Sequence, residues 1–253
     1  MEKSLVSVII PAYNAEKYME ETLLSVLASS YLPIEVIVVN DGSDDGTEQI
    51  AKSFANKFSN FHYFKQINHG LSATRNIAIN YSNGEYILPL DADDLISSDY
   101  IEKAVSVLES RPDVKLVYGA AEFFGDRTGR WKLPEFDISL LAKRNIVYAS
   151  GVYRRKDFDK TGGYCVEIAG LEDWDFWILL LKEGGEVHFI DSVCFYYRIR
   201  KGSMRSRVMK KKKQIVDTLN SRHSRFFQEQ LGGKLHYNRS WSVLLNKLHI
   251  KCL

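Results

Sequence analysis

Three carboxylates follow one apolar run within four positions. Residues 86–97 read YILPLDADDLIS, and Asp91, Asp93 and Asp94 come directly after the apolar part. Like charges this close repel one another unless a positive group lies beside them. Two carboxylates at positions i and i+2 can bind one hard cation and leave coordination positions free for a phosphate. The residue types and their spacing therefore predict a divalent cation site that shares its ion with a phosphate substrate.

Other chemistries use the same pattern. A calcium-binding EF-hand loop starting at Asp91 fails, because Leu95 and Ile96 stand where a ligand and a glycine are needed. A phosphatase that forms an aspartyl phosphate also has two Asp residues two positions apart after a strand, as nucleophile and acid. Acidic residues also favour the positive N-terminal end of a following helix. Taken alone, the DADD motif leaves the phosphatase and helix-cap interpretations open.

Two more charged residues stand where a nucleotide could bind. Asp41 ends the run IEVIVVND, and its carboxylate could accept a hydrogen bond from a base imide or a ribose hydroxyl. A plain turn with a helix cap is the alternative for this segment. Arg75, in GLSATRN, could hold a diphosphate with its fork of donors, pair with nearby aspartates, or lie on the surface.

The segment GLEDWDFW places Glu172 and Asp173 at the start of a predicted helix beside Trp174, Phe176 and Trp177. A carboxylate that aromatic rings partly desolvate has the raised pKa that a general base needs. Capping of the helix by the acidic residues is the simpler alternative. We expect Trp177 to lie in the core.

The elements that must position these residues alternate along the chain. Apolar runs predict strands over 5–10, 34–39, 61–66, 86–90 and 114–119, and helical periodicity predicts helices over 16–29, 47–57, 71–80 and 99–110. This alternation indicates an α/β fold with a mainly parallel sheet and helices on both faces. Ligands bind beyond the carboxyl ends of such strands, where PAYN, NDGSDDGT and DADD all fall.

The second half of the chain is less regular. Residues 121–145 resemble a loop or insertion, whereas residues 172–183 predict a helix, 187–199 a strand and 205–231 a basic helical segment. We divide the chain into residues 1–204, one catalytic domain, and residues 205–253, a basic and mostly helical C-terminal extension.

Composition narrows the class of protein. The chain has 253 residues, of which 45% are hydrophobic and 12% aromatic, as in a globular protein with a sizeable core. Its three cysteines form no CxxC pair, so neither a disulfide framework nor a zinc site is indicated. Residues 5–10 are too few for a signal peptide core, and no apolar run reaches the roughly 18 residues of a membrane span. We expect a cytoplasmic protein.

Charge is divided unevenly along the chain. Residues 1–199 hold 20 Lys and Arg against 30 Asp and Glu, whereas residues 200–253 hold 14 against 2. A cationic tail on an acidic body suggests an anionic partner. Because Trp, Phe and Leu are interleaved with the basic residues, an anionic membrane surface is one candidate, and a solvated basic helix is the other. No nucleic-acid-reading motif accompanies the charge.

The motif series resembles that of the family 2 glycosyltransferases. VSVIIPAYNAEKYMEETLLSVL, IEVIVVNDGSDDGT, GLSATRNIAI, YILPLDADDL and GLEDWDFW occur in the family's order across residues 5–185. The resemblance implies a GT-A fold, transfer of a sugar from a nucleotide-diphosphate sugar with inversion, and a Mn²⁺ or Mg²⁺ cofactor. It also implies a role for each matching residue: base and ribose contacts for Pro11, Ala12, Tyr13 and Asp41, diphosphate contact for Arg75, donor sugar or ribose contact for Asp91, metal binding for Asp93, and base catalysis for Asp173.

One position departs from the family pattern. Many members carry a histidine two residues after the position of Arg198, and this chain has Arg200 there. Histidine could bind a metal ion, whereas arginine cannot but could bind diphosphate oxygens directly. The departure puts a third protein ligand to the metal in doubt.

The resemblance also sets the expected substrates and their alternatives. Within the catalytic domain, residues 1–119 would bind the donor, and residues 120–204 would face the acceptor. A UDP-sugar is the favoured donor. The acceptor would be a glycan or a lipid-linked saccharide, in polysaccharide biosynthesis at the inner face of the cell membrane. The enzyme would be a hexosyl- or N-acetylhexosaminyltransferase. A nucleotidyltransferase would need a glycine-rich loop where PAYNAEKY stands, and a nucleotide-sugar or glycan-binding protein with an inactive site is the other alternative.

Overall fold

The chain forms one mixed β-sheet with helices against both of its faces. The computed structural model describes residues 3–168, 170–200 and 212–248. Within them, the strands follow the order β3-β2-β1-β4-β8-β6-β9-β5, and β7 pairs with β6 outside that path. The strands are β1 (Val6–Ala12), β2 (Ile34–Asp41), β3 (Phe61–Gln66), β4 (Tyr86–Pro89), β5 (Leu95–Ile96), β6 (Val114–Gly125), β7 (Gly129–Trp131), β8 (Val152–Arg154) and β9 (Glu186–Ile199).

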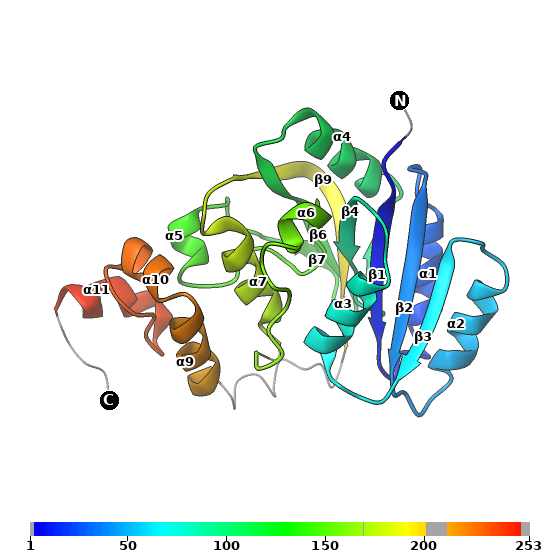
Figure 1. Ribbon diagram of the computed structural model, residues 1–253, viewed down its shortest axis with the longest axis horizontal. Helices are drawn as coiled ribbons and strands as arrows, with labels where there is room; N and C mark the ends of the chain where they lie inside the picture. The colour runs from blue at the N-terminus through cyan, green and yellow to red at the C-terminus, as the bar shows by residue number, and fades with distance from the viewer. Residues whose placement is uncertain (1–2, 169, 201–211, 249–253) are drawn as a thin grey trace.

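Helices follow most of the strands. In Figure 1, α3 lies in front of the parallel strands and α1 behind them. The helices are α1 (Met19–Leu27), α2 (Thr47–Ala55), α3 (Leu71–Asn80), α4 (Tyr100–Ser110), α5 (Ile138–Leu141), α6 (Arg155–Phe158), α7 (Glu172–Leu181), α9 (Lys212–Arg222), α10 (Ser224–Leu231) and α11 (Ser242–Lys247), with the 3₁₀ turn η1 (Arg239–Trp241).

The parallel half of the sheet confirms the predicted alternation. Every residue of β1 and β2 is buried, as continuous apolar runs require in a parallel sheet covered on both faces. β1 lies between β2 and β4, and β2 pairs with β3, all in parallel register. Their carboxyl ends therefore meet at one edge of the sheet, which is where the predicted site residues fall.

The other half differs from the expected pattern. The three-residue strand β8 is antiparallel to both β4 and β6, and β5 is antiparallel to β9. The prediction of a loop over residues 121–145 is partly wrong, because β6 continues to Gly125, turns back into β7 and is followed by α5. β6 is longer than expected because it pairs with β9, which comes much later in the sequence. A local sequence pattern cannot indicate such a partner.

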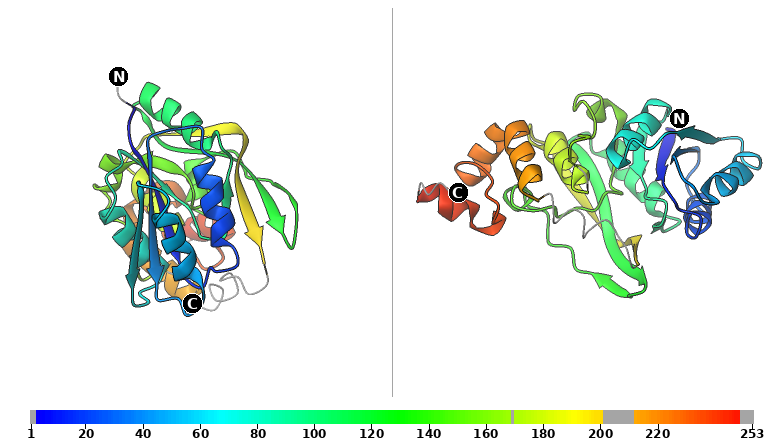
Figure 2. Two further views of the ribbon diagram at one scale, coloured as in Figure 1. Left: turned by 90° about the vertical axis from the view of Figure 1, so that its right-hand side faces the viewer. Right: turned by 90° about the horizontal axis from the view of Figure 1, so that it is seen from below.

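The C-terminal segment is helical over most of its described length. α9, α10, η1 and α11 lie at the opposite end of the molecule's long axis from β3, as Figures 1 and 2 show. The boundary at residues 204 and 205 lies outside the described residues, so the division into domain and extension stays a prediction. Over the part of the chain that the structure describes, the helices are too short or too polar to cross a bilayer.

Candidate active site

The three carboxylates after β4 point in different directions. The Asp94 side chain is buried, and its carboxylate accepts a hydrogen bond from the Arg198 backbone N–H at 2.8 Å. Burial, then the charges of Asp93 and Asp91, hold the pKa of Asp94 well above its usual range. Asp91 and Asp93 remain 32% and 23% exposed. Asp94 therefore fixes the turn against β9, whereas Asp91 and Asp93 keep part of their surface open to solvent.

Arg75 lies inside the protein between two of these elements. Its guanidinium is only 1% exposed and donates at 2.5 Å both to Asp91 after β4 and to Glu172 at the start of α7. The Tyr164 ring lies 5.5 Å from the guanidinium carbon. Of the alternatives that the sequence left open for Arg75, this geometry favours pairing with nearby carboxylates. Contact with a diphosphate stays a prediction for this side chain.

Arg200 pairs with the carboxylate that was expected to bind metal. Its Nε lies 2.7 Å from Asp93 Oδ2, and its guanidinium carbon lies 5.4 Å from the centre of the Tyr18 ring. The neighbouring Arg198 donates through Nε to the Asp93 carbonyl oxygen and lies against Tyr18 and Phe124. The end of β9 thus brings positive charge directly onto the DADD turn.

The donor set at this turn suits a hard cation that takes its remaining ligands from a substrate. Among the residues that the structure describes, no three His, Cys, Asp or Glu side chains are arranged around one point as a complete metal cage. Asp91 and Asp93 nevertheless offer partly exposed carboxylate oxygens, the ligands that Mn²⁺ and Mg²⁺ prefer. Burial and the charge of Asp91 raise the pKa of Asp93 even with Arg200 beside it. A cation would relieve that repulsion.

Asp173 has the properties of a general base. It is half-buried in the first turn of α7, where Oδ1 accepts from the Trp174 backbone N–H at 2.8 Å and Oδ2 from the Asn145 amide at 2.7 Å. Loss of solvation, with the charge of Glu172, raises its pKa to about 7, against the opposing effect of Arg75. A carboxyl group with this pKa can exchange a proton near neutral pH.

The residues expected to hold the nucleoside lie at two neighbouring strand ends. Pro11 and Ala12 are the buried last residues of β1, and Tyr13 beyond them is exposed. Ala12 pairs with Asn40, so the residues that follow these two, Tyr13 and Asp41, lie at the same edge of the sheet. The Asp41 carboxylate accepts hydrogen bonds from the backbone N–H groups of residues 69 and 70 at 2.8 and 2.9 Å and from Gln66. Asp41 therefore shapes the loop before α3, and its nucleoside contact stays a prediction.

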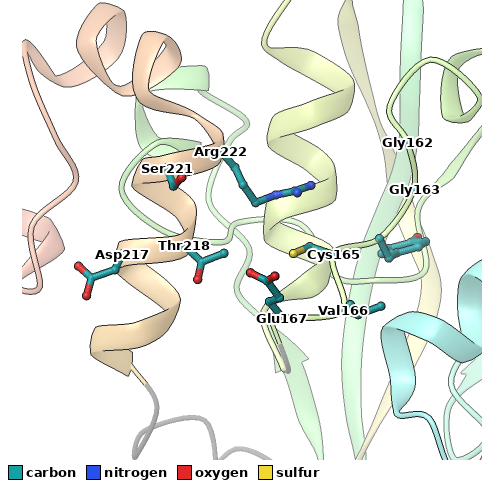
Figure 3. Close-up of a pocket in the computed structure, with 10 residues that line it drawn as sticks. Gly162, Gly163, Cys165, Val166, Glu167, Asp217, Thr218, Ser221 and Arg222 are labelled. Atoms are coloured by element: carbon teal, nitrogen blue, oxygen red, sulfur yellow. The ribbon is translucent and has the colours of Figure 1, made fainter.

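A cavity of about 530 Å³ opens between the loop 162–167 and α9 (Figure 3). Glu167, Asp217 and Arg222 supply charged groups to its wall, and Thr218 and Ser221 supply hydroxyls. The loop also carries Tyr164, whose ring lies beside Arg75. Because Arg75 also pairs with Glu172, this side of the cavity lies near the first turn of α7.

The far side of α7 binds the C-terminal helices. Asp175 is fully buried and accepts from Arg222 Nε at 2.9 Å. It also contacts His223 Nε2 at 2.7 Å. One turn of α7 thus faces both the DADD turn, through Glu172, and α9, through Asp175.

Sequence reasoning found most of these side chains but missed some partners. It considered Glu172 with Asp173 as a helix cap or a desolvated carboxylate, but not as the partner of Arg75, because the spacing between the two carries no local signal. Asn145 lies in the segment that was expected to be a loop, and no pattern there marks it. Trp177 is fully buried, which confirms its predicted place in the core.

Known proteins are similar in sequence to most of this chain. Residues 7–172 match the sequence model described as Glycosyl transferase family 2. The chain is 30% identical over 238 residues to "Glycosyltransferase GlyA" of Streptococcus pneumoniae serotype 4, a match that covers 86% of this chain and 34% of that protein. It is 28% identical over 253 residues to "Putative glycosyltransferase EpsH" of Bacillus subtilis, covering 90% and 71%. The chain spans about a third of the length of the Streptococcus pneumoniae protein and of an uncharacterized Rickettsia conorii glycosyltransferase.

Solved structures share the fold. S. aureus TarS 1-349 in complex with UDP-GlcNAc superimposes with a TM-score of 0.75 at 20% identity, over 97% of this chain and 72% of that one. The mannosyltransferase PcManGT from Pyrobaculum calidifontis, in complex with GDP-Man and Mn²⁺, superimposes with a TM-score of 0.72 at 19% identity, over 98% and 74%.

Proposed function

Since this chain belongs to glycosyl transferase family 2 and has the GT-A fold, we propose that it transfers a sugar, with inversion, from a nucleotide-diphosphate sugar to an acceptor hydroxyl. A UDP-sugar is the first candidate donor, and a hexose or N-acetylhexosamine the sugar it carries. The acceptor would be a glycan or a lipid-linked saccharide. The observation that carries the proposal is the place of Asp173, in the first turn of α7 beside the Glu172 that pairs with Arg75 and hydrogen-bonded by Asn145. Glu172 and Arg75 connect its helix to the DADD turn.

The proposed reaction uses Asp173 as the base. Its carboxylate takes the proton of an acceptor hydroxyl while the hydroxyl oxygen attacks the anomeric carbon from the face opposite the diphosphate. The new bond from carbon to acceptor oxygen forms as the bond from carbon to phosphate oxygen breaks. The electron pair leaves with the nucleoside diphosphate. The products are the glycosylated acceptor with inverted anomeric configuration, the nucleoside diphosphate and a proton on Asp173.

The proposed cofactor is Mn²⁺ or Mg²⁺, held by Asp93 with Asp91 beside it. The ion would supply positive charge for the leaving diphosphate. Arg200 pairs with the Asp93 carboxylate. Because its side chain is 37% exposed, its guanidinium can turn toward phosphate oxygens. Arg75 would act from behind by holding Asp91 and Glu172 in place.

The proposed acceptor site is the cavity between the loop 162–167 and α9. Hydroxyl, carboxylate and guanidinium groups line it, and such groups bind the hydroxyls of a saccharide. Tyr164 lies against Arg75, which pairs with Glu172, the neighbour of Asp173 in the chain. The acceptor hydroxyl would therefore approach the base from the side of α9.

A donor and acceptor screen tests the proposal. Purified protein is incubated with UDP-, dTDP- and GDP-sugars and with octyl glycosides of common hexoses and N-acetylhexosamines, with Mn²⁺ or with chelator. Nucleotide release measures turnover, and NMR of the product gives the anomeric configuration. We expect one donor to be used, with inversion, and Asp173→Asn to bind that donor without transferring its sugar. Donor binding without transfer to any acceptor would favour the binding-protein alternative, and retention of configuration would overturn the mechanism.

A further inference from the structure

The end of the C-terminal segment carries a concentration of exposed apolar side chains. Among the described residues, twelve large hydrophobic side chains are exposed, and four of them fall within residues 237–248. These are Tyr237, Trp241, Leu244 and Leu248, each between 45% and 56% exposed, and we call them the α11 surface. Figure 1 places α11 at the end of the molecule farthest from β3. Exposed apolar groups this close together are typical of an interaction site.

Around the short helix α11, Trp241, Leu244 and Leu248 are exposed, whereas Ser242 is buried and Val243 packs against the core. Trp241, Leu244 and Leu248 are spaced three and four residues apart, which places them on one helix face. On the protein side, the hydroxyl of Ser242 is buried and accepts from the His236 backbone N–H at 3.0 Å.

Asn246 completes the inward face. Its amide donates to the carbonyl oxygens of Leu231 and Lys234 at 3.1 and 3.0 Å, and its oxygen lies 2.8 Å from His236 Nε2. A helix that packs on a soluble protein normally buries its apolar face instead. Here Val243 packs against the core, but Trp241, Leu244 and Leu248 stay exposed and are available to a partner outside the chain.

Charge around the α11 surface is positive. The sequence contains no Asp or Glu after Glu229. Lys247 lies on α11, and the hydrogen bond from Asn246 to the Lys234 carbonyl brings Lys234 beside it. Both lysines are exposed. Trp and Leu on one face with Lys at the margin are the side chains of helices that lie in the interface of an anionic bilayer.

We propose that the α11 surface inserts into the headgroup region of an anionic membrane. A second copy of this chain fits the surface less well, because two such faces in contact would bring their lysines together. The proposal deepens the proposed function, since it would bring the enzyme to a lipid-linked acceptor at the inner face of the cell membrane. Binding to lipid does not itself require sugar transfer.

Vesicle binding tests the proposal with the full chain. Vesicles of phosphatidylcholine alone, or with about one third phosphatidylglycerol, are sedimented with the protein. We expect binding to the anionic vesicles and about tenfold weaker binding by the triple variant Trp241→Gln, Leu244→Gln, Leu248→Gln. The matched control is Leu24→Gln, Leu32→Gln, Ile67→Gln, which removes apolar side chains elsewhere that are at least as exposed, and it should bind like the wild type.

A second measurement separates insertion from simple charge attraction. Brominated lipids should quench the fluorescence of Trp241, and Trp241→Phe should remove the quenched component. Equal binding by the triple variant and the wild type, or binding without quenching, would overturn the proposal. So would a dimer of the wild type that the triple variant turns into a monomer without lipid. The transfer rate on an octyl glycoside should stay unchanged in the triple variant, so failure of the transferase proposal would be seen separately.

Discussion

The guanidinium of Arg75 lies 2.5 Å from the carboxylate of Glu172, which follows it ninety-seven positions later in the chain. The contact joins α3 to α7, and the second half of the guanidinium reaches Asp91 at the same distance. Removing three charged groups from water costs free energy that their mutual attraction only partly repays. We infer that these ion pairs have a positioning role. They hold the first turn of α7, which contains Asp173, against the DADD turn.

Glu172→Gln should destabilise the protein, because it leaves one side of a buried guanidinium without its counter-charge. The expected loss in the free energy of unfolding is about 3 kcal/mol. Asp113→Asn is the matched control, since it breaks the exposed pair with Arg111 and should cost about 1 kcal/mol or less. Urea unfolding of both variants measures the difference. Equal losses would show that the buried pair contributes no more than an exposed one.

Asp173 predicts a pH dependence of the transfer rate. A base acts in its deprotonated form, and the pKa of Asp173 is raised to about 7. The rate should therefore be low at pH 5, rise through pH 7 and level off above pH 8. Asp173→Asn should lower kcat by on the order of 10²–10⁴ and remove the rising limb. A wild-type profile that stays flat between pH 5 and 8 would contradict the assignment.

Asn145 should influence the pH at which the transfer rate rises. Its amide donates to Asp173 Oδ2 and thereby favours the ionised carboxylate. Asn145→Ala removes the donor, so the pKa of Asp173 should increase and the limb should move to higher pH. Asn60→Ala, which loses a hydrogen bond to the Ile34 carbonyl at the start of β2, serves as the control. A limb that moves equally in both variants would mean that Asn145 has no specific effect on the base.

Arg200 should compete with the metal ion for Asp93. An ion pair this exposed contributes at most about 1 kcal/mol, which corresponds to about a fivefold change in affinity. Arg200→Gln should therefore tighten Mn²⁺ binding two- to fivefold, while the KM for the donor rises because one cation near the diphosphate is lost. Mn²⁺ titration by calorimetry measures the first effect and steady-state kinetics the second. Unchanged Mn²⁺ affinity would show that the two cations do not share Asp93.

The sequence predicts the parallel half of the fold and the positions of its site residues. The apolar runs of β1 and β2 and the turn residues after them act locally, so a local reading recovers them. The rest of the fold depends on which strands pair with one another. β8 has three residues whose sequence does not specify an antiparallel place between β4 and β6. The Arg75–Glu172 contact depends on how α7 docks, and the exposure of Trp241, Leu244 and Leu248 depends on which face of α11 meets the protein.

The first turn of α7 has a consequence for exchanging parts between related enzymes. Glu172 is matched to Arg75 on its donor side, and Asp175, two residues after the base, is matched to Arg222 and His223 on its other side. A chimera joined within residues 176–221 would separate Asp175 from both partners and leave a buried charge uncompensated. A workable junction keeps α7 and α9 from the same parent, so the proposed acceptor side would be inherited as one block.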